Sequence, residues 1–267
     1  GVVPAGVATA SFNLESWGYD EATGHAFVRQ LRERLIATPG VTDVSFAAML
    51  PLALRANIDD VEVFGSTTIA GKSRVHYIQV DADYLATLRI PLLEGRDIAM
   101  RDDAQSPKIA VVNETLARTF WPEGSAIGRT FAFRGEDVTI VGVARDAKYV
   151  SLTEATPPLA YVPLAQHWNP RQALMVRTTH DPRTMAPAIH DAVRSIDPGA
   201  PRPVVTTLEE AMGIGLLPQR VAALVTGVLG AVGLLLASVG LYGIIAWSAS
   251  ARTREIGIRV APGARRA

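Results

Sequence analysis

The pattern of apolar and polar residues separates a long region of mixed character from one almost continuous apolar stretch. Residues 221–251 contain no charged side chain, and residues 221–247 are almost wholly apolar. As a helix, residues 221–247 would reach roughly 40 Å, more than the roughly 30 Å hydrocarbon core of a bilayer. A soluble core helix of this length would carry a polar stripe, and this stretch has none. The pattern predicts a transmembrane helix over residues 219–250.

Charges on either side of the apolar stretch predict its orientation. Arg220 stands alone before it. Five arginines follow it, against the single acid Glu255: Arg252, Arg254, Arg259, Arg265 and Arg266. The positive-inside rule places this end in the cytoplasm, so we expect residues 1–215 to be extracytoplasmic.

Small residues recur four apart in the apolar stretch, a spacing that puts them on one helix face. They are Ala223, Gly227 and Ala231, with Gly233 and Ala237 as a second pair. Such a face permits close packing of another membrane helix. The alternative is that glycine is simply common in membrane helices.

Two stretches before the membrane helix share a strand–helix–strand pattern. The first has strands over 9–14 and 41–47 around a helix over 21–38. The second has strands over 173–178 and 203–207 around a helix over 182–196, with Asp181 as N-cap. Each helix ends in a Pro-Gly turn. The pattern predicts an α+β domain containing a split βαβ sandwich, with its helices on one side of the sheet.

Residues 55–165 have mainly short apolar alternations typical of strands. Two short helices interrupt them, near residues 83–88 and 114–121, with Asn113 as N-cap of the second. We therefore predict a porter-like part over 1–54 and 166–215, a mostly-β insertion over 55–165, and a short link over 213–218 into the membrane. The strands are expected over 61–64, 75–80, 109–112, 130–133, 138–143 and 160–163.

Composition removes several classes of function. The 26 basic and 26 acidic side chains balance, so nothing favours a nucleic-acid partner. The chain has no cysteine, which excludes a disulfide scaffold. It begins with Gly1, and its last residues continue a helical pattern. We expect a piece of a longer protein.

No motif for catalysis is found. Gly65 to Ser73 imitates a phosphate-binding loop, but residues 66–70 between its glycines are one more than the motif allows. A strand pattern follows where a helix N-terminus is needed. The histidines, at positions 25, 76, 167, 180 and 190, lack metal-ligand spacing. We predict no catalytic residue, no metal site and no cofactor.

The C-terminal stub allows two interpretations. As a helix it would pair Glu255 with Arg259, place Ile256 and Val260 on one face and end at Pro262. It could serve as a basic anchor at the lipid headgroups or as a docking helix.

The stub sequence from Arg252 to Arg259, RTREIGIR, resembles the cytoplasmic-loop motif of MacB/FtsX-type ABC transporter permeases. Residues 84–96, 112–118, 120–122 and 140–143 resemble the periplasmic core domain of that family. The resemblance covers nearly the whole chain and is closest to the duplicated permeases. Two departures are Arg89, where glycine is usual, and Pro262, where leucine is usual.

The resemblance implies a permease of the bacterial inner membrane with its extracytoplasmic domain between the first and second membrane helices. Residues 252–264 would be the coupling segment that rests on a separate cytoplasmic ABC ATPase subunit, where ATP is hydrolysed. Other partners would be further permease helices or a second permease copy, the bilayer and a periplasmic adaptor. A membrane-anchored binding or regulatory module is the alternative, and a periplasmic enzyme ranks third. The coupling residues implied are Arg252, Arg254, Glu255, Ile256, Gly257 and Arg259.

Overall fold

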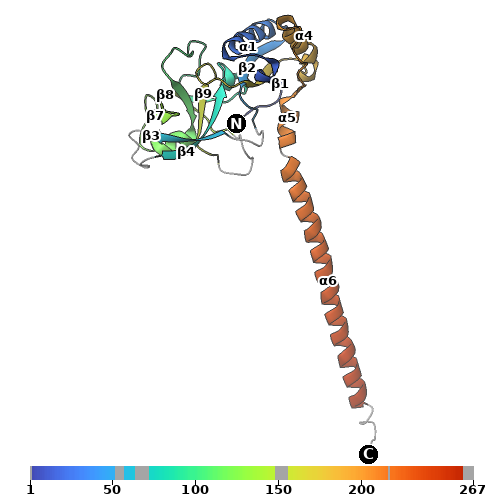
Figure 1. Cartoon of the computed structure of the whole chain (residues 1–267). Coiled ribbons are helices and arrows are strands. Elements are labelled where there is room, and N and C mark those ends of the chain that lie inside the picture. Colours follow the sequence, from blue (N-terminus) through green and yellow to red (C-terminus); the bar gives the residue numbers. More distant parts are fainter. Residues whose placement is uncertain (1, 52–56, 64–71, 148–155, 216, 261–267) are drawn as a thin grey trace, which may run out of the picture. The chain divides into compact units, whose positions relative to one another are not determined.

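The structure, a computed structural model, describes residues 2–51, 57–63, 72–147, 156–215 and 217–260. Within the C-terminal helix, side chains are described for residues 223–245. The chain divides into two compact units, residues 1–215 and 216–267 (Figure 1). The described part of the first unit holds an eleven-stranded sheet with helices, and that of the second is one long helix.

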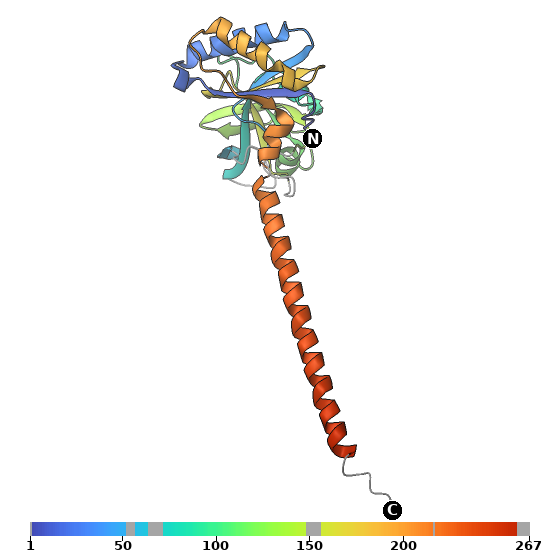
Figure 2. The ribbon, with the colours of Figure 1, turned by 90° about the vertical axis from the view of Figure 1, so that its right-hand side faces the viewer.

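Four strands of the first unit form an antiparallel sheet that carries two helices on one face (Figure 2). In the strand order β11-β1-β10-β2, β10 separates β1 from β2, and β1 separates β10 from β11. Each βαβ unit is thus split by a strand of the other, which confirms the split βαβ prediction. The elements are β1 (Val7–Asn13), α1 (Glu21–Ile36), β2 (Val41–Ala47), β10 (Arg171–Thr178), α4 (Ala186–Ile196) and β11 (Val205–Thr207). Two short 3₁₀ helices, η1 (Glu15–Trp17) and η2 (Pro182–Met185), complete this part.

Local sequence explains where these helices begin. Asp20 accepts a hydrogen bond from the Thr23 backbone N–H at 2.8 Å, and the Thr23 hydroxyl accepts one from the Asp20 N–H. This capping box starts α1. The Asp181 carboxylate accepts from the Arg183 N–H and begins η2, as predicted from the sequence. The apolar faces of α1 and α4 then pack on the sheet in one buried cluster.

Six of the seven remaining strands form a closed barrel. Its order is β4-β3-β7-β8-β6-β9, and a parallel pairing of β9 with β4 closes the ring. A second buried cluster, with Val75, Phe131 and Ile140, fills it. The strands are β3 (Asn57–Val63), β4 (Lys72–Val80), β6 (Ile109–Asn113), β7 (Thr130–Phe133), β8 (Glu136–Ala144) and β9 (Leu159–Pro163). Short helices α2 (Tyr84–Thr87) and α3 (Glu114–Phe120) and the edge strand β5 (Leu92–Gly95) flank it.

Several predictions in this region can be compared with the structure. Asn113 caps α3 as predicted, accepting from the Leu116 N–H at 2.9 Å. Strand β5 was not predicted, because its four residues are all exposed and do not alternate. Lys72 and Ser73 of the loop that imitates a phosphate-binding site lie in a strand, and residues 64–71 lie outside the described residues.

The predicted link over residues 213–218 is helical wherever the structure describes it. Helix α5 (Leu208–Gly215) and helix α6 (Leu217–Val260) occupy all of it except residue 216, which is not described. Glycine is tolerated in helices, and Pro218 lies in the first turn of α6, where its missing N–H has no partner to lose.

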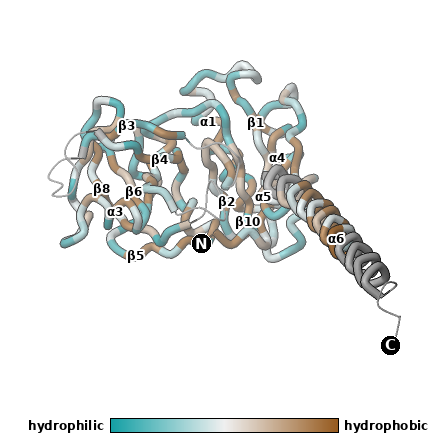
Figure 3. The backbone as a smooth tube through the Cα atoms, turned by 90° about the horizontal axis from the view of Figure 1, so that it is seen from below, coloured by the Kyte–Doolittle hydropathy of each residue, from teal (hydrophilic) through white to brown (hydrophobic). Residues whose placement is uncertain are grey.

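The second unit holds one candidate for the predicted membrane helix. Residues Ala223–Ile245 of α6 are long and apolar enough to span a membrane, with a mean hydropathy of 2.2 and none of the window buried. Figure 3 shows the apolar stretch along α6. The helix is longer than the predicted 219–250, and it includes residues 252–260 of the stub. Residues 261–267, with Pro262, lie outside the described residues.

Candidate functional site

The two ends of the folded unit leave it side by side. Strand β1 begins at Val7 and strand β11 ends at Thr207, and these strands pair antiparallel with Ala8 opposite Thr207. Opposite residues of antiparallel strands have Cα atoms about 4.5–5.5 Å apart. The chain therefore enters β1 and leaves β11 at neighbouring points, at the same end of two paired strands.

The outgoing end is fixed where α5 begins. The Thr207 hydroxyl accepts a hydrogen bond from the Glu210 N–H at 3.1 Å, and the Glu210 carboxylate accepts from the Thr206 hydroxyl at 2.8 Å. Leu208, the first residue of α5, is fully buried in the core cluster between the sheet and the barrel. Met212 packs against the same cluster from one turn further on.

Arg183 adds an ion pair to this start of α5. Its Nε and Nη2 atoms donate to Glu210 Oε1 at 3.1 and 2.7 Å. The Arg183 hydrogen bonds, and then that from Thr206, lower the pKa of Glu210 to about 2. Both side chains of the pair are largely solvent-exposed. The contact is therefore open to water and salt.

The incoming end is fixed by buried contacts. Arg177 of β10 is only 7% exposed. Its guanidinium donates to three backbone carbonyls: Val3 O at 2.7 Å, Ala5 O at 2.8 Å and Thr87 O at 2.6 Å. Burial, and next the nearby charge of Arg89, lower the pKa of Arg177. Among the described residues it forms no ion pair, so its hydrogen bonds go to carbonyl oxygens, while the charge of Asp43 acts on it from a longer distance.

The residues predicted for helix packing all lie exposed on α6. A Cβ atom added at Gly227 or Gly233 would meet nothing within 4 Å. The face defined by these residues therefore has no partner among the described residues. They are Ala223, Gly227, Ala231, Gly233 and Ala237.

The predicted coupling segment is continuous with the same helix. The backbone of residues 252–260 is helical, while their side chains and residues 261–264 lie outside the described part. The structure therefore gives a helical backbone to the predicted coupling residues, while their role stays a prediction. These residues are Arg252, Arg254, Glu255, Ile256, Gly257 and Arg259.

A cleft of about 260 Å³ lies between α1 and the loops over residues 100–104 and 164–168. Arg32 closes one end through Asp81, Asp83 at 3.2 Å and the Ala82 carbonyl at 2.9 Å. The cleft volume is below the roughly 300 Å³ of a small ligand pocket, and we assign it no substrate.

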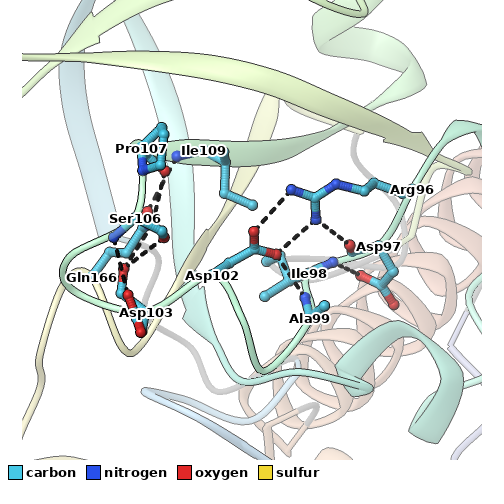
Figure 4. Close-up of polar contacts among 10 residues, drawn as sticks. All are labelled: Arg96, Asp97, Ile98, Ala99, Asp102, Asp103, Ser106, Pro107, Ile109 and Gln166. Carbon is cyan, nitrogen blue, oxygen red and sulfur yellow. Dashed lines mark hydrogen bonds and ion pairs between the residues drawn. The ribbon is translucent and has the colours of Figure 1, made fainter.

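Polar contacts hold the loops that border this cleft (Figure 4). Arg96 donates to both carboxylate oxygens of Asp102 at 2.7 and 2.8 Å. The Gln166 amide nitrogen donates to Ser106 Oγ at 3.0 Å and to the Asp103 carbonyl at 3.2 Å. In the part of the chain that the structure describes, no group of three His, Cys, Asp or Glu side chains could hold a metal ion.

Sequence reasoning missed the residues that fasten the two ends of the folded unit. Arg177 carries a recognisable signal, because it follows the apolar run from Ala173 to Val176 inside a buried strand. Glu210 follows Thr207 at the spacing of a capping box. The exposed Arg183 carries no such signal, because its partner is far away in the sequence.

Comparisons with known proteins agree with this architecture. Residues 7–196 match the family described as MacB-like periplasmic core domain. The chain is 25% identical over 223 residues to an uncharacterized ABC transporter permease, YknZ, of Bacillus subtilis, covering 77% of this chain and 55% of the relative. It is 23% identical over 218 residues to the macrolide export ATP-binding/permease protein MacB of Marinobacter nauticus, covering 76% of this chain and 33% of that relative. The chain spans about half or less of the length of these two relatives.

Solved structures show the same fold. The periplasmic region of MacB from Actinobacillus actinomycetemcomitans has a TM-score of 0.53 at 13% identity, with 78% of this chain and 91% of that chain covered. The extracellular domain of the ABC-type transporter YknZ has a TM-score of 0.50 at 11% identity, with 75% of this chain and 100% of that chain covered.

Proposed function

The chain belongs to the MacB-like periplasmic core domain family, and from this membership we propose that it is part of the permease of an ABC-type transport or mechanotransmission system. The permease passes the energy of cytoplasmic ATP hydrolysis to its extracytoplasmic domain. Relatives described as ABC transporter permeases support this proposal.

One structural observation carries the proposal. The four-stranded sheet of the folded unit is entered before Val7 and left after Thr207, at neighbouring ends of two paired strands. This arrangement suits a domain inserted between two consecutive membrane helices. Such a domain is held at both ends, so movement of the helices relative to each other acts directly on its sheet.

The coupling segment is residues 252–264, on the cytoplasmic side. Helix α6 runs without interruption from the membrane span through residue 260, so its backbone is a rigid lever between bilayer and stub. Excess arginine after the span supports the cytoplasmic placement. Within the segment, Glu255 and Ile256 present a charge and an apolar side chain, which a purely electrostatic anchor does not need.

A cytoplasmic ABC ATPase is the partner of this segment. We place the ATPase in a separate subunit. By contrast, the relatives MacB and PvdT are each described as an ATP-binding/permease protein. Further permease helices or a second permease copy cover the small-residue face from Ala223 to Ala237. A periplasmic adaptor is a further partner of the folded domain. The membrane is the bacterial inner membrane.

We also propose two parts within the folded unit. The porter-like part comprises residues 1–54 and 166–215, and the mostly-β insertion comprises residues 55–165. The interlocked βαβ strands on one side and the closed barrel on the other support this division. Strands β2 and β4 join the two parts through the single pair Ala47 and Val80.

The topology can be tested with single cysteines, since the chain has none of its own. Val204→Cys lies at an 82% exposed position of the folded unit, and Thr253→Cys lies in the stub. In intact cells with a permeabilised outer membrane, an impermeant maleimide should label position 204 and reach position 253 only after lysis. Labelling of both positions before lysis, or of position 253 alone, would show that the stub cannot meet a cytoplasmic ATPase.

A further inference from the structure

One segment of the folded unit contacts four others. We call residues 177–183, from the last residues of β10 to the first residues of η2, the hub segment. Arg177 bonds the incoming N-terminal segment and the end of α2, and Arg183 bonds the start of α5. Between them, Thr178 and Thr179 bond the turn that joins α1 to β2. Four other segments thus meet at the hub segment: the incoming segment, the end of α2, the start of α5 and the turn between α1 and β2.

The turn between α1 and β2 is seated closely on the hub segment. The Gly40 carbonyl accepts hydrogen bonds from the Thr179 N–H at 2.8 Å and from the Thr178 hydroxyl at 3.0 Å. Gly40 has φ +83, and an added Cβ would lie 2.0 Å from His180 Nδ1. The turn and the hub segment are therefore in backbone contact, with no room for a side chain between them.

The incoming segment is held by backbone hydrogen bonds and by the guanidinium of Arg177. Besides the two bonds from Arg177, the Thr178 N–H donates to the Gly6 carbonyl at 2.9 Å, and the Val3 N–H donates to the Leu88 carbonyl at 2.9 Å. The guanidinium is buried, so water competes little for its three carbonyls. Opening this contact would remove the Val3 and Ala5 carbonyls from the buried guanidinium and leave it the Thr87 carbonyl, which is unfavourable for a buried charge.

The outgoing helix is held differently. After the buried Leu208, α5 depends on the exposed pair Arg183–Glu210, whose side chains are 69% and 44% exposed. An exposed ion pair exchanges readily with water. Met212 is only half-buried, and Gly213 follows it. This end can open without exposing a buried charge.

We propose that the hub segment is a double clamp of unequal strength: it holds the incoming segment rigidly through Arg177 and holds α5 through a releasable contact at Arg183. Both arginines are positioning residues. The clamp follows from contacts within the folded unit, and only its use in transmitting membrane movement rests on the proposed function. Under that function, the first membrane helix is fixed to the sheet and α5 is the side that yields.

Hydrogen–deuterium exchange of the full chain in lipid nanodiscs tests the clamp. In the wild type, peptides from α5 should exchange at least tenfold faster than peptides covering residues 3–6. Arg177→Met should raise exchange at residues 3–6 and 87–89 about tenfold or more and leave α5 unchanged. Arg183→Gln should raise exchange in residues 209–213 and leave residues 3–6 unchanged. Arg171→Met, at the exposed other end of β10, is the matched control and should change neither.

A general loss of stability would raise hydrogen exchange throughout the folded unit, and this pattern distinguishes it from opening of the clamp. If Arg177→Met raises exchange equally across α1, the barrel and α5, or not at all at residues 3–6, the clamp is refuted. If Arg177→Met fails to fold, Arg177→Lys serves instead, because an ammonium on a flexible stem cannot reproduce the fork to three carbonyls. It should then raise exchange at residues 3–6 without affecting α5, and equal effects at both ends overturn the proposal. These outcomes do not depend on any ATPase, so failure of the clamp and failure of the proposed function are separable.

Discussion

Asp97 is a carboxylate that burial makes acid-sensitive. It lies on the loop after β5, beside the Arg96–Asp102 pair (Figure 4). Burial, opposed by the hydrogen bond from the Ile98 N–H at 2.7 Å and increased by the nearby Asp83, raises the pKa of Asp97 to about 6. Arg96 donates to the backbone carbonyl of Asp97, while its ion pair goes to Asp102. The Asp97 charge is therefore held without an ion pair among the described residues.

The magnitude follows from the pKa difference. Between the ordinary 3.8 and about 6 lie roughly two pKa units, which correspond to about 3 kcal/mol as an upper value. Partial exposure to water reduces this, so we expect about 1–3 kcal/mol. Because the folded state binds the Asp97 proton more tightly than the unfolded chain does, this contribution is fully present below about pH 4. It is lost as pH rises through about 6.

Asp97→Asn removes the charge and keeps an oxygen for the Ile98 N–H. We expect the variant to unfold with a free energy about 1–3 kcal/mol higher than the wild type at pH 7.5 and nearly equal at pH 4. The measurement is urea unfolding of the full chain in detergent micelles, followed by tryptophan fluorescence across that pH range.

Asp102→Asn is the control with the opposite sign. Burial of Asp102 opposes its ionisation, but the Arg96 ion pair and the bond from the Ala99 N–H together hold the pKa of Asp102 below its ordinary value. Removing that charge should lower stability at pH 7.5 by about 1–3 kcal/mol, and the loss should shrink in acid. If Asp97→Asn shifts the free energy of unfolding equally at pH 4 and pH 7.5, or lowers it at pH 7.5, then burial does not make ionisation of Asp97 costly. The reasoning then fails.

Three further substitutions test positive backbone φ angles and a side chain that bonds backbone N–H groups, each by urea unfolding in micelles. Gly40→Ala should lower the free energy of unfolding by about 1–3 kcal/mol, mostly because alanine is strained at φ +83. Adding His180→Ala removes the steric clash and should recover only the smaller part of this loss. Full recovery of the free energy of unfolding would contradict backbone strain as the main cause. Arg89→Gly should stabilise by about 0.5–1 kcal/mol, because Arg89 has φ 56, where glycine is unstrained; no gain would count against strain there. Asn113→Ala should cost about 3 kcal/mol, because its oxygen accepts from two buried backbone N–H groups; a loss under 1 kcal/mol would contradict that role.

The sequence predicted the features that depend on neighbouring residues. Asn113 and Asp181 act as the caps expected, because a capping side chain bonds a backbone group two or three residues away. The apolar faces of α1 and α4 follow the helical period and are buried as expected. The helix over the apolar stretch was predicted because helices of soluble proteins rarely carry an uninterrupted apolar stretch of this length, and residues Ala223–Ile245 are long and apolar enough to span a membrane.

The features that escaped prediction join residues far apart. The parallel pairing that closes the barrel sets Ile78 beside Tyr161, with no local trace in either strand. The second bond of Asn113, to the Leu159 N–H, is equally distant in sequence. Arg89 stands where the family resemblance leads us to expect glycine, and its positive φ is a conformation that glycine adopts without strain. The coupling residues from Arg252 to Arg259 remain a prediction, because their side chains lie outside the described part of the structure.

The central claim is that residues 252–264 dock on an ABC ATPase. The most direct test is co-purification of the full-length parent protein from membranes with its candidate ATPase subunit. The wild type should retain the ATPase, and Glu255→Lys combined with Ile256→Asp should lose it without losing membrane insertion. The control Arg265→Gln with Arg266→Gln lowers the positive charge outside the segment and should retain it. If no form binds an ATPase, or if only the arginine control loses it, the segment is a basic anchor and the chain is a membrane-anchored binding module.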